Sequence, residues 1–88
     1  GGAVAAAVGG RLKRLGETIQ VLVVTHSPQV AAEGHVHWKI AKDETTGLQR
    51  TTAKELAKTE RVEEIARMLS GEMITEEARA ASLKLLEN

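Results

Sequence analysis

One histidine directly follows a run of apolar residues. The stretch Val21–Ala31 reads VLVVTHSPQVA, in which four apolar residues precede Thr25 and His26. A run without polar alternation is typical of a strand buried on both faces of a parallel sheet. In open α/β sheets, ligands bind outside the carboxyl ends of the strands, and His26 occupies such an end. There it can contact a phosphate oxygen or a nearby water, or it can hydrogen-bond a loop carbonyl. Its position fits both roles.

Ser27 and Pro28 predict the start of a short helix after His26. Serine is a favoured N-cap, and proline is favoured at the first helical position. We expect this helix to run to about Glu33 and to end at Gly34. The free N–H groups at its start would favour an anion. Ser27 has no histidine and aspartate relay beyond its neighbour, and capping explains it fully.

Two further histidines are a possible pair of metal ligands. His35 and His37 are two residues apart, so they would share one face of a strand. The sequence has no cysteine and no well-placed carboxylate to complete a tetrahedral set, which favours a half-exposed sheet face over a metal site. The glycine pairs at 1–2 and 9–10 form no phosphate loop, because neither belongs to a GxxxxGKS or GxxxxGKT pattern.

The composition predicts one small domain with an aliphatic core. The 88 residues include one Trp and no Tyr or Phe, and 12 basic residues balance 12 acidic ones. A formal charge of zero gives no electrostatic reason for this chain alone to bind nucleic acid or an anionic membrane. The absence of cysteine fits a reducing compartment. No apolar run approaches the roughly 20 residues of a membrane span.

Apolar spacing predicts a helix and two strands in the first half of the chain. One stripe, Val4, Val8, Leu12 and Leu15, indicates a helix over residues 3–15, in which Gly9 and Gly10 imply close packing against another element. Strands over 19–25 and 35–42 would be parallel neighbours with a right-handed crossover. A strand as apolar as the first one is typical of a position between two neighbouring strands, so we expect the rest of its sheet to lie outside this sequence.

The second half predicts a hairpin and two helices. The strand over 35–42 would place Trp38 in the core. The chain would turn at 43–47 and return as a second strand over 48–52. Residues 53–60 fit either a loop or an extension of the following helix. The alternating charges of KTERVEEIARM indicate a solvated helix face. Thr75 would cap the last helix. The expected inner faces of the two helices are Val62, Ile65, Ala66 and Leu69, and Ala78, Ala81, Ser82 and Leu85. The predicted class is α/β, in the order α-β-α-β-β-α-α with an incomplete sheet.

At this point the sequence resembles a known family. The similarity extends over GGAVAAAVGGRLKRLG, QVLVVTHSPQVAA, HVHWKIAK, RVEEIARMLSG and TEEARAASLKLL. Together these stretches resemble the C-terminal part of the head domain in the RecN family of bacterial DNA repair proteins, which are SMC-like ABC ATPases. VTHSPQVAA and ERVEEIARMLSG are the specific parts, and the resemblance is weakest over residues 43–58.

The resemblance implies a P-loop NTPase fold that binds ATP and Mg²⁺ between two heads. The family's Walker A, signature motif and Walker B have no counterpart in this sequence. Gly1 and Gly2 look like the residues just after Walker B and the D-loop. VTH looks like the H-loop, so His26 matches the switch histidine that contacts the ATP γ-phosphate, a catalytic and cofactor-binding role in the intact head. The implied partners are the rest of the head, a second head, and DNA through the longer protein, with no membrane. The implied location is the bacterial cytoplasm, associated with the nucleoid.

Two functional classes remain open for residues 1–88. One is the C-terminal lobe of an ATPase head that acts in recombinational repair of DNA double-strand breaks; alone, this lobe would be inactive and prone to self-association. The other is a stand-alone α/β protein-interaction module without catalytic activity. The sequence begins without a methionine and contains a buried-type strand that lacks a neighbour, and both features favour the first class.

Overall fold

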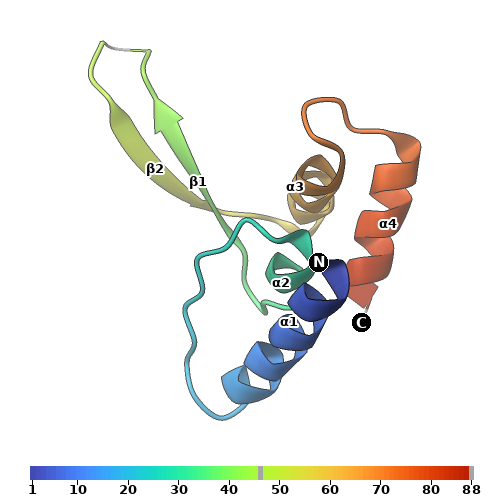
Figure 1. Cartoon of the computed structure of the whole chain (residues 1–88). Coiled ribbons are helices and arrows are strands. Elements are labelled where there is room, and N and C mark those ends of the chain that lie inside the picture. Colours follow the sequence, from blue (N-terminus) through green and yellow to red (C-terminus); the bar gives the residue numbers. More distant parts are fainter. Residues whose placement is uncertain (46, 88) are drawn as a thin grey trace.

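The computed structural model describes residues 1–45 and 47–87, which form helices and a single hairpin (Figure 1). In chain order the elements are α1 (Gly2–Gly16), α2 (Pro28–Ala31), β1 (Trp38–Asp43), β2 (Arg50–Glu55), α3 (Lys58–Ser70) and α4 (Glu76–Glu87). Helix α1 lies beside α2, α3 packs on α4, and the hairpin projects away from the helices. The mixed helix and strand class is therefore confirmed. None of the described helices is long and apolar enough to cross a membrane.

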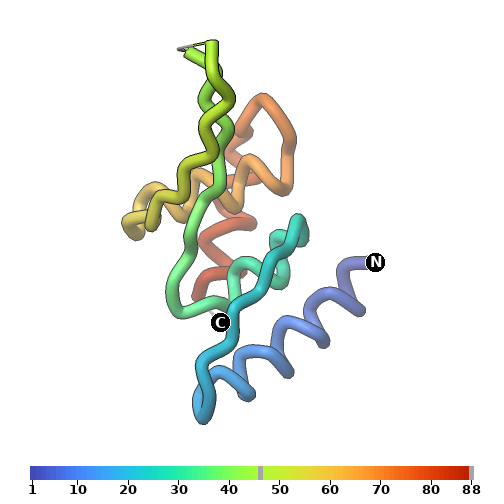
Figure 2. Tube along the Cα trace, turned by 90° about the vertical axis from the view of Figure 1, so that its left-hand side faces the viewer, coloured from blue at the N-terminus to red at the C-terminus, as the bar shows by residue number. Residues whose placement is uncertain are grey.

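The predicted strand over residues 19–25 is wrong. This segment leads from α1 to α2 as a long connection without regular secondary structure (Figure 2). The predicted parallel pairing with residues 35–42 is also wrong, because β1 pairs with β2 in an antiparallel two-stranded sheet. A strand exists through hydrogen bonds to a neighbouring strand. The part of the chain that the structure describes places no such neighbour beside this apolar segment.

The predicted hairpin is confirmed, with its second strand shifted along the chain. The register pairs Trp38 with Glu55 and Asp43 with Arg50, so residues 53–55 belong to β2 and α3 begins only at Lys58. Both strands are exposed along their whole length. The expectation that Trp38 is a core residue is wrong, because 53% of its surface is exposed on the projecting hairpin.

The core lies between α3 and α4. Ile65 and Ala66 are fully buried on α3, and Ser82 is fully buried on α4, where its Oγ donates a hydrogen bond to the carbonyl oxygen of Val62 (2.7 Å). The predicted cap is confirmed, because Thr75 Oγ1 accepts a hydrogen bond from the backbone N–H of Ala78 (3.0 Å). A serine at the helix contact permits close approach and gives its hydroxyl a partner.

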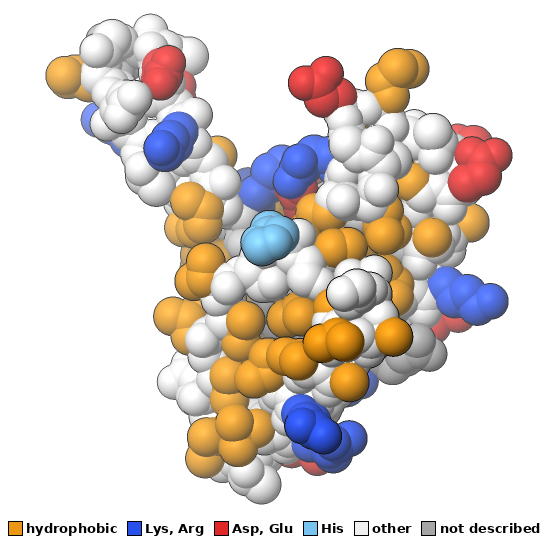
Figure 3. Space-filling model, in the orientation of Figure 1, with side chains coloured by type: hydrophobic (Ala, Val, Ile, Leu, Met, Phe, Trp, Pro, Cys, Tyr) orange, Lys and Arg blue, Asp and Glu red, His pale blue; other side chains and the backbone are white. Residues whose placement is uncertain are grey.

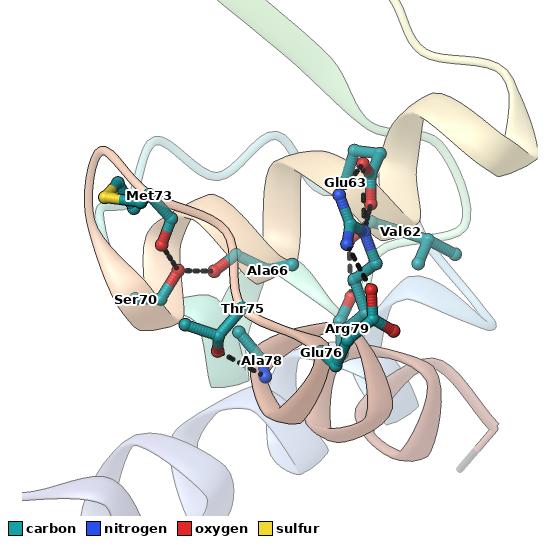
Figure 4. A network of polar contacts seen from close by, with 10 residues as sticks. Val62, Glu63, Ala66, Ser70, Met73, Thr75, Glu76, Ala78 and Arg79 are labelled. Carbon is teal, nitrogen blue, oxygen red and sulfur yellow. Dashed lines mark hydrogen bonds and ion pairs between the residues drawn. The ribbon is translucent and has the colours of Figure 1, made fainter.

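Polar contacts join the two helices around this core (Figure 4). Arg79 of α4 forms an ion pair with Glu63 of α3, with 2.9 Å between Nε and Oε2. Two residues of the predicted inner faces are more exposed than expected, namely Ala81, which is exposed, and Leu69, which is 37% exposed. The helical period placed the inner faces correctly, but a contact between only two helices is narrower than the predicted stripes.

Helix α1 packs on α2 through a glycine. A Cβ atom built on Gly9 would lie 3.2 Å from the carbonyl oxygen of Gln29 and 3.0 Å from Cγ of Glu33, so a larger residue would push the two helices apart. The predicted close packing is confirmed at Gly9, whereas Gly10 faces open space. The apolar stripe predicted as the inner face is largely exposed, with Val4 at 67%. The face of α1 that carries Gly9 makes the contact with α2, so the apolar stripe of α1 remains largely uncovered.

A buried carboxylate attaches the hairpin to α3. Lys39 and Lys54 lie directly opposite each other in the hairpin, an unfavourable pairing of like charges. Each is neutralised by α3: Lys39 Nζ lies 2.8 Å from Glu64 Oε2, and Lys54 Nζ lies 2.5 Å from Glu60 Oε2. Arg67 forms a second ion pair with Glu64. Burial opposes ionisation of Glu64, but the hydrogen bonds from Lys39 and Arg67 outweigh it, so its pKa lies below its ordinary value.

We predict that the Glu64 pair makes folding sensitive to acid. Because the pKa of Glu64 is lower in the folded than in the unfolded state, its contribution is complete above the ordinary value of 4.5 and is lost as pH falls through the folded pKa. Glu64→Gln should therefore unfold more easily at neutral pH, by about 1–3 kcal/mol, and lose less stability on acidification than the wild type. Urea unfolding at neutral pH and below pH 4.5 measures both effects.

Glu72→Gln is the matched control for this prediction. Glu72 is exposed in the connection between α3 and α4, and its replacement should reproduce the wild-type acid response. An unchanged loss of stability on acidification in Glu64→Gln would contradict the assignment.

Candidate functional site

His26 is exposed in the turn that precedes α2. The backbone N–H of Ser27 donates to Thr25 Oγ1 (3.0 Å), and Ser27 Oγ accepts from the backbone N–H of Val30 (3.3 Å). Pro28 occupies the start of α2, with Ser27 as its N-cap, as the sequence predicts. Local hydrogen bonds therefore hold the backbone on both sides of His26, and its imidazole faces solvent.

The start of α1 lies next to this turn. A Cβ atom built on Gly2 would lie 3.5 Å from Nε2 of Gln29, and Oε1 of the same Gln29 accepts a hydrogen bond from Ser27 Oγ (3.1 Å). In Figure 1 the N-terminus accordingly lies beside α2. The structure thus brings Gly2 close to Gln29 of α2, directly after the His26 turn, although Gly2 and His26 are 24 positions apart in the sequence.

His35 and His37 lie apart from this turn, in the segment that leads into β1. His35 is exposed, and His37 is partly buried. Burial lowers the pKa of His37, the positive charge of Arg61 lowers it further, and Glu64 opposes both effects. Across residues 1–45 and 47–87, no three His, Cys, Asp or Glu side chains gather where they could hold a metal ion.

One functional candidate escaped the sequence prediction. Arg61 reaches from α3 to the carboxyl end of α2, where its Nη2 donates to the carbonyl oxygens of Ala31 (3.1 Å) and Ala32 (3.1 Å) and also to that of Gly34. The charge pattern around Arg61 predicts a solvated face, which is wrong here, because Arg61 is half-buried and Glu64 is buried. Backbone carbonyls are its partners, and they leave no signature in the sequence.

An uncovered apolar surface lies beside the turn. Leu22 is 90% exposed and Val24 is 95% exposed, immediately before Thr25. Figure 3 shows that apolar side chains gather over this connection and over the neighbouring α1. The residues of this surface, called the apolar surface below, are Val4, Val8, Leu15, Ile19, Leu22, Val23 and Val24. A continuous apolar surface of this kind is typical of a contact with further protein.

Comparison with known proteins identifies clear relatives, although no family model matches the chain. The chain is 52% identical to DNA repair protein RecN of Xylella fastidiosa (strain 9a5c) over 87 residues, which are 99% of this chain and 16% of the relative. RecN of Rickettsia felis is 48% identical over 86 residues, or 98% of this chain and 16% of the relative. RecN of Deinococcus radiodurans is 52% identical over 71 residues, or 81% of this chain and 13% of the relative. The resemblance predicted from the sequence is therefore confirmed, and the chain spans about a sixth of the length of these relatives.

We predict that the isolated chain self-associates through the apolar surface. Water around an unpaired apolar segment is released when two copies cover it, and an unpaired strand-like backbone is a template for pairing. Leu22→Lys should shift the chain towards the monomer, because it places a charge within the apolar surface. Sedimentation velocity over a wide concentration range measures the change.

Met73→Lys is the control for association. Met73 is 82% exposed in the connection between α3 and α4, outside the apolar surface, so its replacement should leave association unchanged. A wild-type chain that stays monomeric at every concentration and unfolds in one sharp transition would refute the prediction.

Proposed function

We propose, from the similarity of this chain to RecN, that residues 1–88 form the C-terminal lobe of an SMC-like ABC ATPase head. In this proposal the longer protein acts in recombinational repair of DNA double-strand breaks. It binds ATP and Mg²⁺ between two heads of P-loop NTPase fold, and DNA through parts outside this chain. Its place is the bacterial cytoplasm, near the nucleoid. The stand-alone interaction module would explain the apolar surface but not the 52% identity to RecN.

The observation that carries the proposal is the exposed His26 on a fixed turn. Hydrogen bonds at Thr25 and Ser27 hold the backbone on either side of the histidine, and the imidazole faces outward. Gly2, which resembles a residue just after Walker B and the D-loop, lies against Gln29 of α2, directly after the turn. This arrangement suits a side chain that contacts a ligand bound between this lobe and other parts of a head.

Residues 19–25 form no strand in this structure, and in the proposed head they would become one only by pairing within a larger sheet. Pairing would satisfy the backbone groups of this segment and bury Leu22 and Val24, which are almost fully exposed here. It would also fix His26 at the carboxyl end of a rigid strand, where ligands of open α/β sheets bind. The same contact thus accounts for the apolar surface and for the placement of the histidine.

The proposed role of His26 is to stabilise the transferring phosphoryl group. Phosphoryl transfer depends almost entirely on positioning and on electrostatic stabilisation of the transition state. His26 would donate a hydrogen bond to a γ-phosphate oxygen, or hold the attacking water. Such a contact strengthens as charge develops in the transition state, so it raises turnover more than it raises ground-state affinity.

We predict that His26→Ala lowers ATP turnover in the RecN-length protein by about 10²–10³-fold, the usual cost of removing one such donor. Nucleotide affinity should change far less, because the adenine and inner phosphates would contact other parts of the head. Steady-state ATPase rates, normalised by the folded fraction, and a direct nucleotide-binding measurement test this together. His35→Ala is the control, since His35 is also exposed but lies outside the turn. Near-normal turnover in folded His26→Ala would remove the proposed role.

We also predict that the isolated 88-residue chain neither binds ATP tightly nor hydrolyses it. The sequence contains no GxxxxGKS or GxxxxGKT loop to cradle the phosphates, and one histidine cannot replace that loop. Isothermal titration calorimetry of the chain with Mg²⁺ and ATP should show no micromolar binding. A micromolar dissociation constant would contradict the division of roles between this lobe and the rest of the head.

A further inference from the structure

Arg61 closes the carboxyl end of α2 from a neighbouring helix. Its Nη2 donates to three carbonyl groups at and just after the end of α2, those of Ala31, Ala32 and Gly34. The last carbonyls of a helix have no donor within the helix and need one from outside. A positive charge at this end also complements the helix dipole. Arg61 therefore satisfies the end of α2 at the point where the chain turns towards β1.

Helix α2 depends on such external contacts because it is very short. It contains four residues, Pro28–Ala31, and an isolated helix of that length does not persist in water. Three contacts hold it: the Ser27 cap at its start, the close approach of Gly9 from α1, and Arg61 at its end. Of these three, only Arg61 connects α2 to α3 by side-chain hydrogen bonds.

The same short helix determines where His26 lies. His26 directly precedes the N-cap Ser27, so any shift or fraying of α2 moves the turn that presents the imidazole. Ser27 is hydrogen-bonded to Gln29 and Val30, and both of these residues belong to α2. The chain of contacts therefore runs from Arg61 through the α2 carbonyls to the Ser27 cap and then to His26.

We infer that Arg61 is a positioning residue that holds the His26 turn in place through α2. This inference rests on the proposed function, in which His26 acts on the γ-phosphate. All three hydrogen bonds come from one guanidinium nitrogen, Nη2. Arginine suits this half-buried position because its guanidinium is always charged and is more weakly hydrated than an ammonium. Misplacement of a catalytic contact by about 1 Å can cost about 10²-fold in rate, so a residue that never touches ATP would still affect turnover.

The test uses the RecN-length protein with Arg61→Met, which keeps an unbranched chain and removes every donor. We expect kcat to fall about 10-fold or more while nucleotide affinity stays near the wild-type value. Amide hydrogen exchange over residues 29–34 should become faster, since α2 loses its contact with α3. Arg79→Met is the control, because the hydrogen bonds and ion pairs of Arg79 among the described residues go to Glu63 and Glu76 and not to α2; it should leave both readouts unchanged.

A double variant separates positioning from a general loss of stability. If Arg61 acts through His26, then Arg61→Met should lower kcat per folded molecule no further once His26→Ala is present. Full additivity of the two losses would overturn the inference. So would wild-type kcat, or unchanged exchange in α2, in the single Arg61→Met variant.

Arg61→Lys keeps the positive charge and part of the donor set, and it carries the same comparison if Arg61→Met does not fold. We expect a smaller fall in kcat, again without additivity to His26→Ala. Failure of the proposed function has a different signature: normal turnover in His26→Ala alone, with amide exchange still reporting whether Arg61 holds α2.

Discussion

Helix α3 is the constraint on which the rest of the molecule depends. Within a little more than one turn, Arg61 binds the carbonyls of α2, Glu64 binds Lys39 of the hairpin, and Ile65 is fully buried on the helix that packs against α4. These contacts differ in kind: hydrogen bonds to backbone, a buried ion pair, and apolar burial. Each faces a different part of the chain. This small chain with almost no aromatic residues is therefore held together by contacts of its other elements with one helix, α3, rather than by a broad apolar core.

The sequence predicted the features that depend on near neighbours. Ser27 and Thr75 were recognised as caps because an N-cap bonds an amide only two or three residues away. Gly9 was recognised as a close-packing site because a glycine within a helix otherwise weakens it. The hairpin was found through its alternation and its turn, in which Gly47 has a φ of 76°, a conformation that favours glycine.

The features that depend on distant partners were not predictable in the same way. The apolar run before His26 has the composition of a buried strand, but strand formation depends on a neighbour that composition does not supply. The partners of Arg61 are carbonyl oxygens, which every residue carries, so no pattern of side chains in the sequence predicts these hydrogen bonds. Glu64 likewise belonged to a charge alternation that suggests solvent, and only the position of Lys39 in space makes it a buried anchor.

The candidate site combines both kinds of feature. His26 lies between an apolar run and a capped helix, and both features are visible in the residues next to it. His26 could therefore be singled out from the sequence. What holds it there is not local, because α2 is too short to persist alone and is fixed through α1 on one side and α3 on the other. The apolar surface beside the turn remains open, and Leu22 and Val24 expose almost all of their surface. The backbone that presents His26 is thus supported after the histidine by α2, whereas before it, within the described part of the chain, only the local hydrogen bond to Thr25 acts, and the proposed larger sheet would supply the further support.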